Sequence, residues 1–148
     1  MAGGEGVRVG LGLVVVNDAG QILLTRRLHG DNGPGEFAVP GGAYEPGESM
    51  AAGVLRELAE ECGDQFKVRA PVPLCVLTYV TTTGEQWLGV NYLAQWESGE
   101  PRVMEPDKHE GWAWHDIATP PQPLYLPTQY AIEAMRTGRV WFDEAIKP

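Results

Sequence analysis

The sequence predicts an α/β fold in which helices cover the faces of a mixed sheet. Strand-like segments rich in branched residues occupy residues 7–27 and 72–97, with one helical segment at residues 49–62 between them and another at 128–136. This order of strands, helix, strands and helix is typical of a sheet with helices packed on it. The 148 residues are 43% hydrophobic, enough for one domain with its own core, so we expect a single domain over residues 1–148.

The first strand-like segment is expected to be a β-hairpin. Residues 7–16 and 21–27 are rich in Val, Leu and Ile, and the turn residues Asn17-Asp18-Ala19-Gly20 separate them. A loop follows, then the short apolar run Phe37-Ala38-Val39, and then Pro40-Gly41-Gly42. The two glycines predict a sharp turn at which the backbone comes close to another group, because no Cβ stands in the way.

Residues 49–62 have the clearest helical pattern. No proline interrupts them, Ser49 is expected to cap the start, and Gly63 is expected to end the helix. Four apolar residues recur at i, i+4, i+7 and i+11 and are expected to form one buried stripe: Ala51, Leu55, Leu58 and Cys62. On this interpretation Cys62 is a core residue and not a nucleophile.

The second half of the chain is expected to supply three further strands and a helix. Two strands at residues 72–80 and 86–97 are joined by a hairpin loop, and a short strand at 112–115 follows a long polar loop. The proline-rich stretch after it excludes a regular helix. The last helix is therefore expected at residues 128–136, capped by Thr128.

The composition restricts the partners of the protein. The formal net charge is −9, so polymeric DNA or RNA is repelled, whereas a small anion binds if metal cations bridge it. The two cysteines make no disulfide framework. The first residues lack the basic region of a signal peptide, and the apolar run at residues 7–16 is too short to span a bilayer. We therefore expect a cytoplasmic protein with no membrane contact.

Three glutamates crowd the second half of the first helix. At 100° per residue, Glu57, Glu60 and Glu61 fall within one sector of about 100°, where they repel one another. A hard divalent cation with oxygen ligands, Mg²⁺ or Mn²⁺, would relieve this repulsion. Arg56 lies four residues before Glu60 and is expected to hold either that carboxylate or Glu48 in a fixed rotamer.

These residues resemble a known motif. Gly42, five residues, Glu48, seven residues and then Arg56-Glu57-Leu58-Ala59-Glu60-Glu61-Cys62-Gly63 are similar to the Nudix box, G-x5-E-x7-R-E-U-x-E-E-x-G-U with U apolar. All seven fixed letters match, and Asp64 departs from the final apolar position. Residues 8–16, 37–42 and 105–114 also resemble the MutT-like nucleoside triphosphate pyrophosphatases of this superfamily.

The resemblance implies a Nudix α/β/α sandwich that hydrolyses a nucleoside diphosphate linked to another moiety. It implies that Glu57, Glu60 and Glu61 bind Mg²⁺, for which Mn²⁺ can substitute, together with the carbonyl of Gly41. For a MutT-like enzyme the reaction is (d)NTP to (d)NMP and pyrophosphate. Two alternatives stay open: hydrolysis of ADP-ribose, another nucleotide sugar or a dinucleoside polyphosphate, and a non-catalytic Nudix domain that binds nucleotides. Such enzymes are monomers or homodimers, and the five tryptophans favour a homodimer.

A carboxylate must take the proton of the attacking water. The candidates are Glu57 and an acid of the loop before the last strand, where Glu110 is preferred because it lies next to Trp112, while Glu105 and Asp107 remain open. The expected catalytic residues are accordingly Arg56, Glu57, Glu60 and Glu110. The three histidines are scattered without metal-ligand spacing and are assigned no role: His29, His109 and His115.

The substrate is expected to contact six residues: Arg27, Gly41, Gly42, Asn91, Tyr125 and Leu126. Arg27, the better match to a substrate-side arginine in related enzymes, also fits a strand end in solvent, as does Arg26. Asn91 fits either a contact to a base edge or an exposed strand position. A wall for base stacking and ordinary core packing are both compatible with four residues: Trp112, Trp114, Tyr125 and Leu126.

Overall fold

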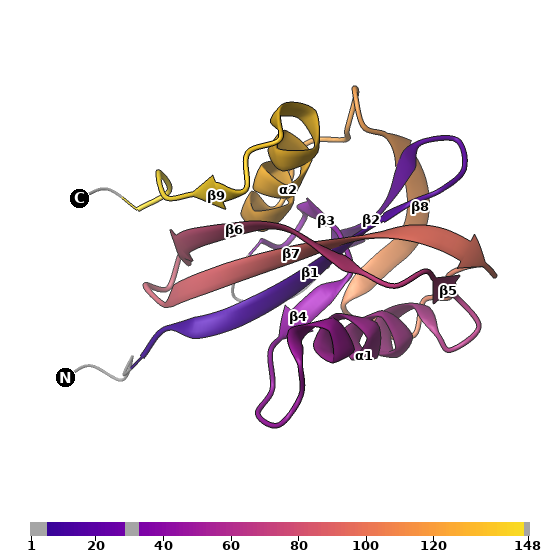
Figure 1. Cartoon of the computed structure of the whole chain (residues 1–148), viewed down its shortest axis with the longest axis horizontal. Coiled ribbons are helices and arrows are strands. Elements are labelled where there is room, and N and C mark those ends of the chain that lie inside the picture. Colours follow the sequence, from indigo (N-terminus) through magenta and orange to yellow (C-terminus); the bar gives the residue numbers. More distant parts are fainter. Residues whose placement is uncertain (1–5, 29–32, 147–148) are drawn as a thin grey trace.

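The computed structural model describes residues 6–28 and 33–146, and its centre is a mixed sheet (Figure 1). Along the sheet the strands run β3-β2-β1-β7-β6-β9, while β4, β5 and β8 pair with β1, β7 and β2. The elements are β1 (Arg8–Val16), β2 (Gln21–Arg27), β3 (Phe37–Ala38), β4 (Gly41–Ala43), α1 (Met50–Cys62), β5 (Lys67–Val68), β6 (Val72–Val80), β7 (Gln86–Ser98), β8 (His109–Asp116), α2 (Leu126–Thr137) and β9 (Trp141–Phe142).

Strand β1 organises the sheet. It runs parallel to β7 from Arg8↔Trp87 to Val16↔Gln95, and antiparallel to β2 at Val16↔Ile22. The short strand β4 pairs with the first half of β1, with Gly41 opposite Gly12. Parallel and antiparallel pairs therefore occur in one sheet, and the predicted mixed sheet is confirmed.

The two helices lie on opposite faces of this sheet (Figure 1). Leu11 and Leu13 of β1 are buried with Leu58 on the side of α1, whereas Val14 is buried with Ile132 on the side of α2. Successive residues of a strand point to opposite faces, so one apolar strand can serve two cores. This layering confirms the predicted α/β/α sandwich. No helix in the described part of the chain is long and apolar enough to cross a membrane.

Helix α1 begins and ends as predicted, and its predicted buried stripe is confirmed at Leu58 and Cys62 but wrong at Leu55. The hydroxyl of Ser49 accepts a hydrogen bond from the amide of Ala52, and the amide of Gly63 donates to the carbonyl of Ala59. Leu55 is 42% exposed, whereas its neighbour Val54 is 1% exposed. The helix is thus rotated relative to the predicted stripe, and the residues that face the interior are Gly53, Val54, Leu58, Glu61 and Cys62.

This rotation predicts different stabilities for two leucine variants of the same helix. We expect Leu58→Ala to lower the free energy of unfolding by about 2–5 kcal/mol, because Leu58 is 3% exposed and the change leaves a cavity. Leu55→Ala is expected to change it by less than about 1 kcal/mol, because that side chain already contacts solvent. Urea denaturation of both variants measures the difference; equal losses would contradict this burial pattern.

Helix α2 begins before the predicted Thr128. Its first residues are Leu126 and Pro127, and Tyr125 occupies the N-cap position without a side-chain hydrogen bond. Proline fits the first turn of a helix because its missing N–H has no intrahelical partner there. Thr128 is fully buried and its hydroxyl accepts a hydrogen bond from the amide of Val39 at 3.2 Å, so it ties α2 to the segment before β4 instead of capping the helix.

Candidate active site

The two glycines of β4 bring the backbone against both β1 and α1. A Cβ on Gly41 would collide with the carbonyl oxygen of Leu11, and a Cβ on Gly42 would overlap the carboxylate of Glu57. The close approach predicted for this turn is therefore present. It places a strand without side chains directly beside the acidic face of α1.

Glu61 is the most buried acid of the cluster. Only 7% of the residue is exposed, and its Oε1 accepts a hydrogen bond of 2.9 Å from the amide of Gly41. Burial, together with the nearby carboxylates of Glu57 and Glu105, raises the pKa of Glu61 to about 8 against the opposing effect of the Gly41 amide. The indole of Trp112 donates to the Glu61 carbonyl at 3.1 Å, which fixes the end of the helix.

Glu57 and Glu60 occupy the more open part of the same face. The Glu57 side chain is 12% exposed, and burial raises its pKa even though Arg56 opposes this shift. The Glu60 side chain is 50% exposed. The three glutamates therefore do not form an even exposed row, because the rotation of α1 takes Glu61 inward and leaves Glu60 at the rim.

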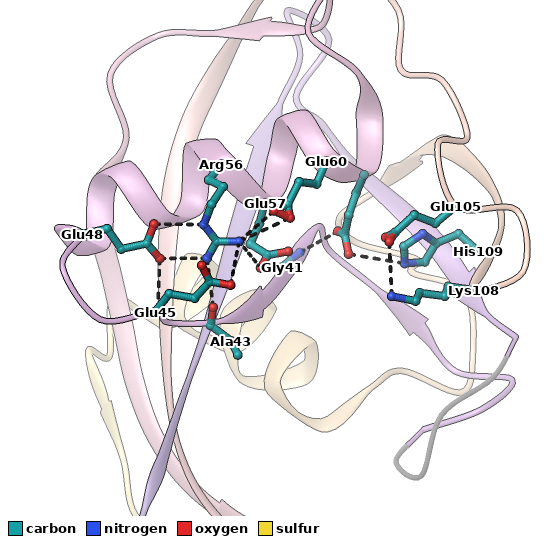
Figure 2. Close-up of polar contacts among 11 residues, drawn as sticks. Gly41, Ala43, Glu45, Glu48, Arg56, Glu57, Glu60, Glu105, Lys108 and His109 are labelled. Carbon is teal, nitrogen blue, oxygen red and sulfur yellow. Dashed lines mark hydrogen bonds and ion pairs between the residues drawn. The ribbon is translucent and has the colours of Figure 1, made fainter.

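Arg56 connects the acids to one another (Figure 2). Its guanidinium donates to both carboxylate oxygens of Glu48 at 2.9 and 2.8 Å, to Glu57 at 2.8 Å and to Glu60 at 2.9 Å. It also donates to the carbonyl of Ala43 at 3.0 Å. The two orientations considered from the sequence, toward Glu48 and toward Glu60, thus occur together. These carboxylates, with Glu48 first, raise the pKa of Arg56, so it stays charged.

Two residues from a distant part of the chain complete the cluster. Ligand atoms of Glu61, Glu105 and His109 all lie within 4.8 Å of one another, and Nε2 of His109 lies 3.6 Å from Oε2 of Glu61. Burial lowers the pKa of His109 and so favours its neutral imidazole, although the nearby carboxylate of Glu105 opposes this shift. Lys108 pairs with Glu105 at 3.2 Å on the outer side (Figure 2).

The structure does not bring Glu110 to this cluster. Its carboxylate pairs with Arg26 at 3.3 Å, and both residues line a separate hollow with Phe37 and His115. Strand β8 begins at His109 and not at the predicted residue 112, so His109 and Glu110 already point to opposite faces. The acid of this loop that reaches the helix carboxylates is Glu105, one of the two residues that the sequence left open.

The position of His109 beside the acids was not predicted, because its spacing in the sequence is not that of a metal ligand. Its position next to Glu61 depends on a contact between residues 48 positions apart, which no local spacing reveals. His115 lies 6.0 Å from Phe37, away from the acids, and His29 lies outside the described residues.

A cavity of about 290 Å³ adjoins the glycine strand. Three glycines, Gly10, Gly12 and Gly89, expose the backbone of β1 and β7 along it. Among the predicted substrate contacts, five line this cavity: Arg27, Gly41, Gly42, Asn91 and Tyr125. The side chains of Trp87, Asn91 and Leu77 pack against Gly10, Gly12 and Gly89, where a Cβ would meet them.

The structure shows the surroundings of several residues for which the sequence allowed two interpretations. Asn91 is 2% exposed and donates from Nδ2 to the carbonyl of Pro127 at 3.2 Å, so it is not an exposed strand residue. The guanidinium of Arg27 lies 4.2 Å from the ring centre of Tyr125, so Arg27 is not simply a solvated strand end. Three residues of the suggested stacking wall pack against hydrophobic cores and not into the cavity: Trp112, Trp114 and Leu126.

Comparison with known proteins identifies the class of the chain. A family model described as the NUDIX domain matches residues 6–134. The nucleoside triphosphatase NudI from Enterobacter sp. (strain 638) is 30% identical over 108 residues, which are 68% of this chain and 76% of that protein. A MutT NUDIX hydrolase structure from Burkholderia pseudomallei has a TM-score of 0.81 and 39% identity, over 88% of this chain and 98% of that one.

The chain therefore belongs to the Nudix family and is a Nudix hydrolase. An RNA pyrophosphohydrolase from Ruthia magnifica subsp. Calyptogena magnifica is also similar, with 39% identity over 67 residues. That match covers 45% of this chain and only 35% of the RNA pyrophosphohydrolase. The resemblance seen in the sequence is thus confirmed at the level of the family.

Proposed function

We propose that this Nudix hydrolase converts small nucleoside triphosphates, (d)NTP, into (d)NMP and pyrophosphate. The observation that carries the proposal is the position of the half-buried Glu57 and the buried Glu61 on one side of the glycine strand β4, with a cavity of about 290 Å³ adjoining the same strand. A nucleoside in the cavity would direct its phosphates toward the acids. The name of the similar protein NudI, a nucleoside triphosphatase, supports this substrate class.

The acidic cluster fits Mg²⁺, with Mn²⁺ as a substitute. Burial and mutual repulsion raise the pKa values of Glu57 and Glu61, and a divalent cation would favour their ionised forms. We assign Glu57, Glu60, Glu61 and the carbonyl of Gly41 as ligands. When bound, the cation neutralises phosphate charge and favours ionisation of the attacking water.

The protein's own residues hold these carboxylates in place. Arg56 fixes the rotamers of Glu57 and Glu60, and the amide of Gly41 fixes Glu61. We propose Arg56, Glu57 and Glu60 as catalytic residues on this basis. Preorganised charges of this kind need no rearrangement during the reaction.

Glu105 is our choice for the acid that takes the proton of the attacking water. It reaches the cluster from the loop before β8, whereas Glu110 pairs with Arg26 elsewhere. A general base must lie within hydrogen-bonding reach of the proton that it removes. Glu57 remains the alternative base.

Paired variants separate the two loop acids. We expect Glu105→Gln to lower kcat by about 10²-fold or more, because an amide cannot accept the proton. Glu110→Gln is expected to lower kcat by less than about threefold, because it removes only an exposed ion pair. Steady-state kinetics at saturating Mg²⁺ would measure both. A larger loss of kcat in Glu110→Gln than in Glu105→Gln would identify Glu110 as the general base.

The cavity supports one nucleoside as its occupant. Trp87 and Tyr125 offer aromatic side chains, Asn91 offers a polar group, and Arg27 lines the same cavity as the glycines of β4. A volume of about 290 Å³ is small for two nucleosides, which favours a triphosphate over a dinucleoside polyphosphate. ADP-ribose and related nucleotide sugars, or nucleotide binding without turnover, stay as the alternatives.

We further propose that residues 1–148 act as one domain that forms a homodimer. The edge strand β9 and the residue before it expose apolar side chains, with Val140 65% and Trp141 58% exposed. Exposed aromatic residues are enriched at interfaces between proteins.

A product-release assay tests the proposed reaction. The purified chain is incubated with canonical and oxidised (d)NTPs, ADP-ribose and a dinucleoside tetraphosphate, with and without Mg²⁺. We expect pyrophosphate from triphosphates only with Mg²⁺. Products only from ADP-ribose would favour the nucleotide-sugar alternative, and nucleotide binding without turnover of any substrate would favour the non-catalytic one.

A further inference from the structure

His109 is a buried imidazole whose environment suggests a ligand. It is the first residue of β8 and is 7% exposed. Its Nδ1 is buried and has no hydrogen-bond partner among the described residues. The ring packs against Trp112 at a centroid distance of 5.4 Å, and its Nε2 is directed at the carboxylate of Glu61. Hydrogen bonding within the described structure therefore does not account for the burial of this polar ring.

The distances around His109 suit a shared cation. The 3.6 Å between Nε2 and Oε2 of Glu61 is longer than the usual 2.7–3.2 Å of an N–H···O hydrogen bond. Two ligands that each lie about 2.0–2.2 Å from one ion are separated by about 3.0–3.6 Å. Glu105 supplies a third ligand atom within 4.8 Å of the other two. These donors come from α1, the loop between β7 and β8, and β8 itself, so the fold brings them together.

We propose that Glu61, Glu105 and His109 form a mixed oxygen and nitrogen site that binds a first-row transition cation such as Mn²⁺ more tightly than Mg²⁺. Imidazole is a good ligand for such cations, whereas Mg²⁺ prefers oxygen ligands and keeps its water. The inference rests on the proposed function, because Glu61 is also assigned to the catalytic cation and Glu105 to the attacking water. A carboxylate that binds the cation through one oxygen keeps the other oxygen to accept the proton. The inference adds a cation preference that the Nudix box itself does not contain.

The expected contribution of His109 is about tenfold in Mn²⁺ affinity. A histidine ligand is usually strengthened by a hydrogen bond from its other nitrogen to a carboxylate or carbonyl, which fixes its tautomer. No described residue accepts such a bond from Nδ1 of His109. We therefore expect a gain in Mn²⁺ affinity at the low end of the range for a histidine ligand.

Electron paramagnetic resonance with Mn²⁺ tests this site directly. The experiment measures the Mn²⁺ dissociation constant and the ¹⁴N coupling in electron spin echo spectra of the whole chain, His109→Gln and His115→Gln. We expect ¹⁴N coupling in the wild type and in His115→Gln, whose histidine lies beside Phe37. His109→Gln should lose the coupling and bind Mn²⁺ about tenfold more weakly, with a smaller change for Mg²⁺.

The wild-type spectrum alone can reject the proposal even if His109→Gln fails to fold. Bound Mn²⁺ without ¹⁴N coupling, in a protein that hydrolyses triphosphates with Mg²⁺, would overturn the role of His109 and leave the proposed function intact. Coupling that persists in a folded His109→Gln would also overturn it. Absence of both Mn²⁺ binding and Mg²⁺-dependent turnover would overturn this inference and the proposed function together.

Discussion

Glu61→Gln is expected to lower the Mg²⁺-dependent hydrolysis rate by about two to three orders of magnitude. Glutamine keeps an oxygen that can accept the hydrogen bond from the amide of Gly41, so the local backbone should not move. It removes the negative charge that faces the phosphates and the cation. The measurement is kcat/KM for the preferred triphosphate, with Mg²⁺ varied to separate weaker cation binding from slower chemistry.

The stability of the same variant shows whether the loss is functional. Burial raises the pKa of Glu61 to about 8, well above the value for an exposed glutamate. The folded protein then holds a proton that the unfolded chain releases, so without metal the wild type loses stability relative to Glu61→Gln as pH rises from about 5 through about 8. The metal-free variant should therefore be at least as stable as the wild type at pH 8.

Glu60→Gln is the matched control on the same helix. The Glu60 side chain is 50% exposed and lies at the rim of the cluster, so we expect a loss of about tenfold, smaller than that for Glu61→Gln. An unchanged rate in Glu61→Gln would contradict the assignment of Glu61 as a cation ligand. A larger loss in Glu60→Gln would mean that the cation lies on the outer side of α1.

The sequence predicted the order of the main elements and the bounds of helix α1 because both depend on local patterns. The glycines of β4 and the caps of α1 follow from backbone chemistry within a few residues. The rotation of α1 could not be predicted in this way. Ala51, Leu55, Leu58 and Cys62 fit a buried stripe by spacing. Packing against β1 instead buries Val54, contact with β4 and β8 buries Glu61, and Leu55 stays exposed.

Contacts between distant segments account for the other differences. The true start of β8 at His109 depends on its pairing with β2, where Arg27 lies opposite His109 and the register shifts after Thr25. Without that pairing, Glu110 and Glu105 could not be distinguished by sequence. The burial of Asn91 depends likewise on the start of α2, where the carbonyl of Pro127 accepts a hydrogen bond from the Asn91 side-chain amide. The helices and strands could therefore be predicted from local sequence, whereas the side chains through which they contact one another could not.

Gly42→Ala is expected to lower the hydrolysis rate by about 10²-fold while leaving the fold largely intact. A Cβ at this position would overlap the carboxylate of Glu57, which is the far end of a flexible side chain and can move away. Glu57 would then lose its place beside Arg56, from which it accepts a hydrogen bond of 2.8 Å. The predicted loss thus arises from a displaced carboxylate and not from unfolding.

Two other glycine variants make this experiment specific. Gly41→Ala sets a Cβ against the backbone carbonyl of Leu11, which cannot move without disturbing the sheet, so it is expected to lower both stability and activity. At Gly111 a Cβ would meet no described atom within 4 Å, so Gly111→Ala should leave both unchanged. Thermal unfolding and kcat/KM are measured for all three variants. Normal activity in a folded Gly42→Ala would mean that the position of Glu57 beside β4 is not needed for the reaction, and equal unfolding of Gly42→Ala and Gly41→Ala would assign the loss to the fold.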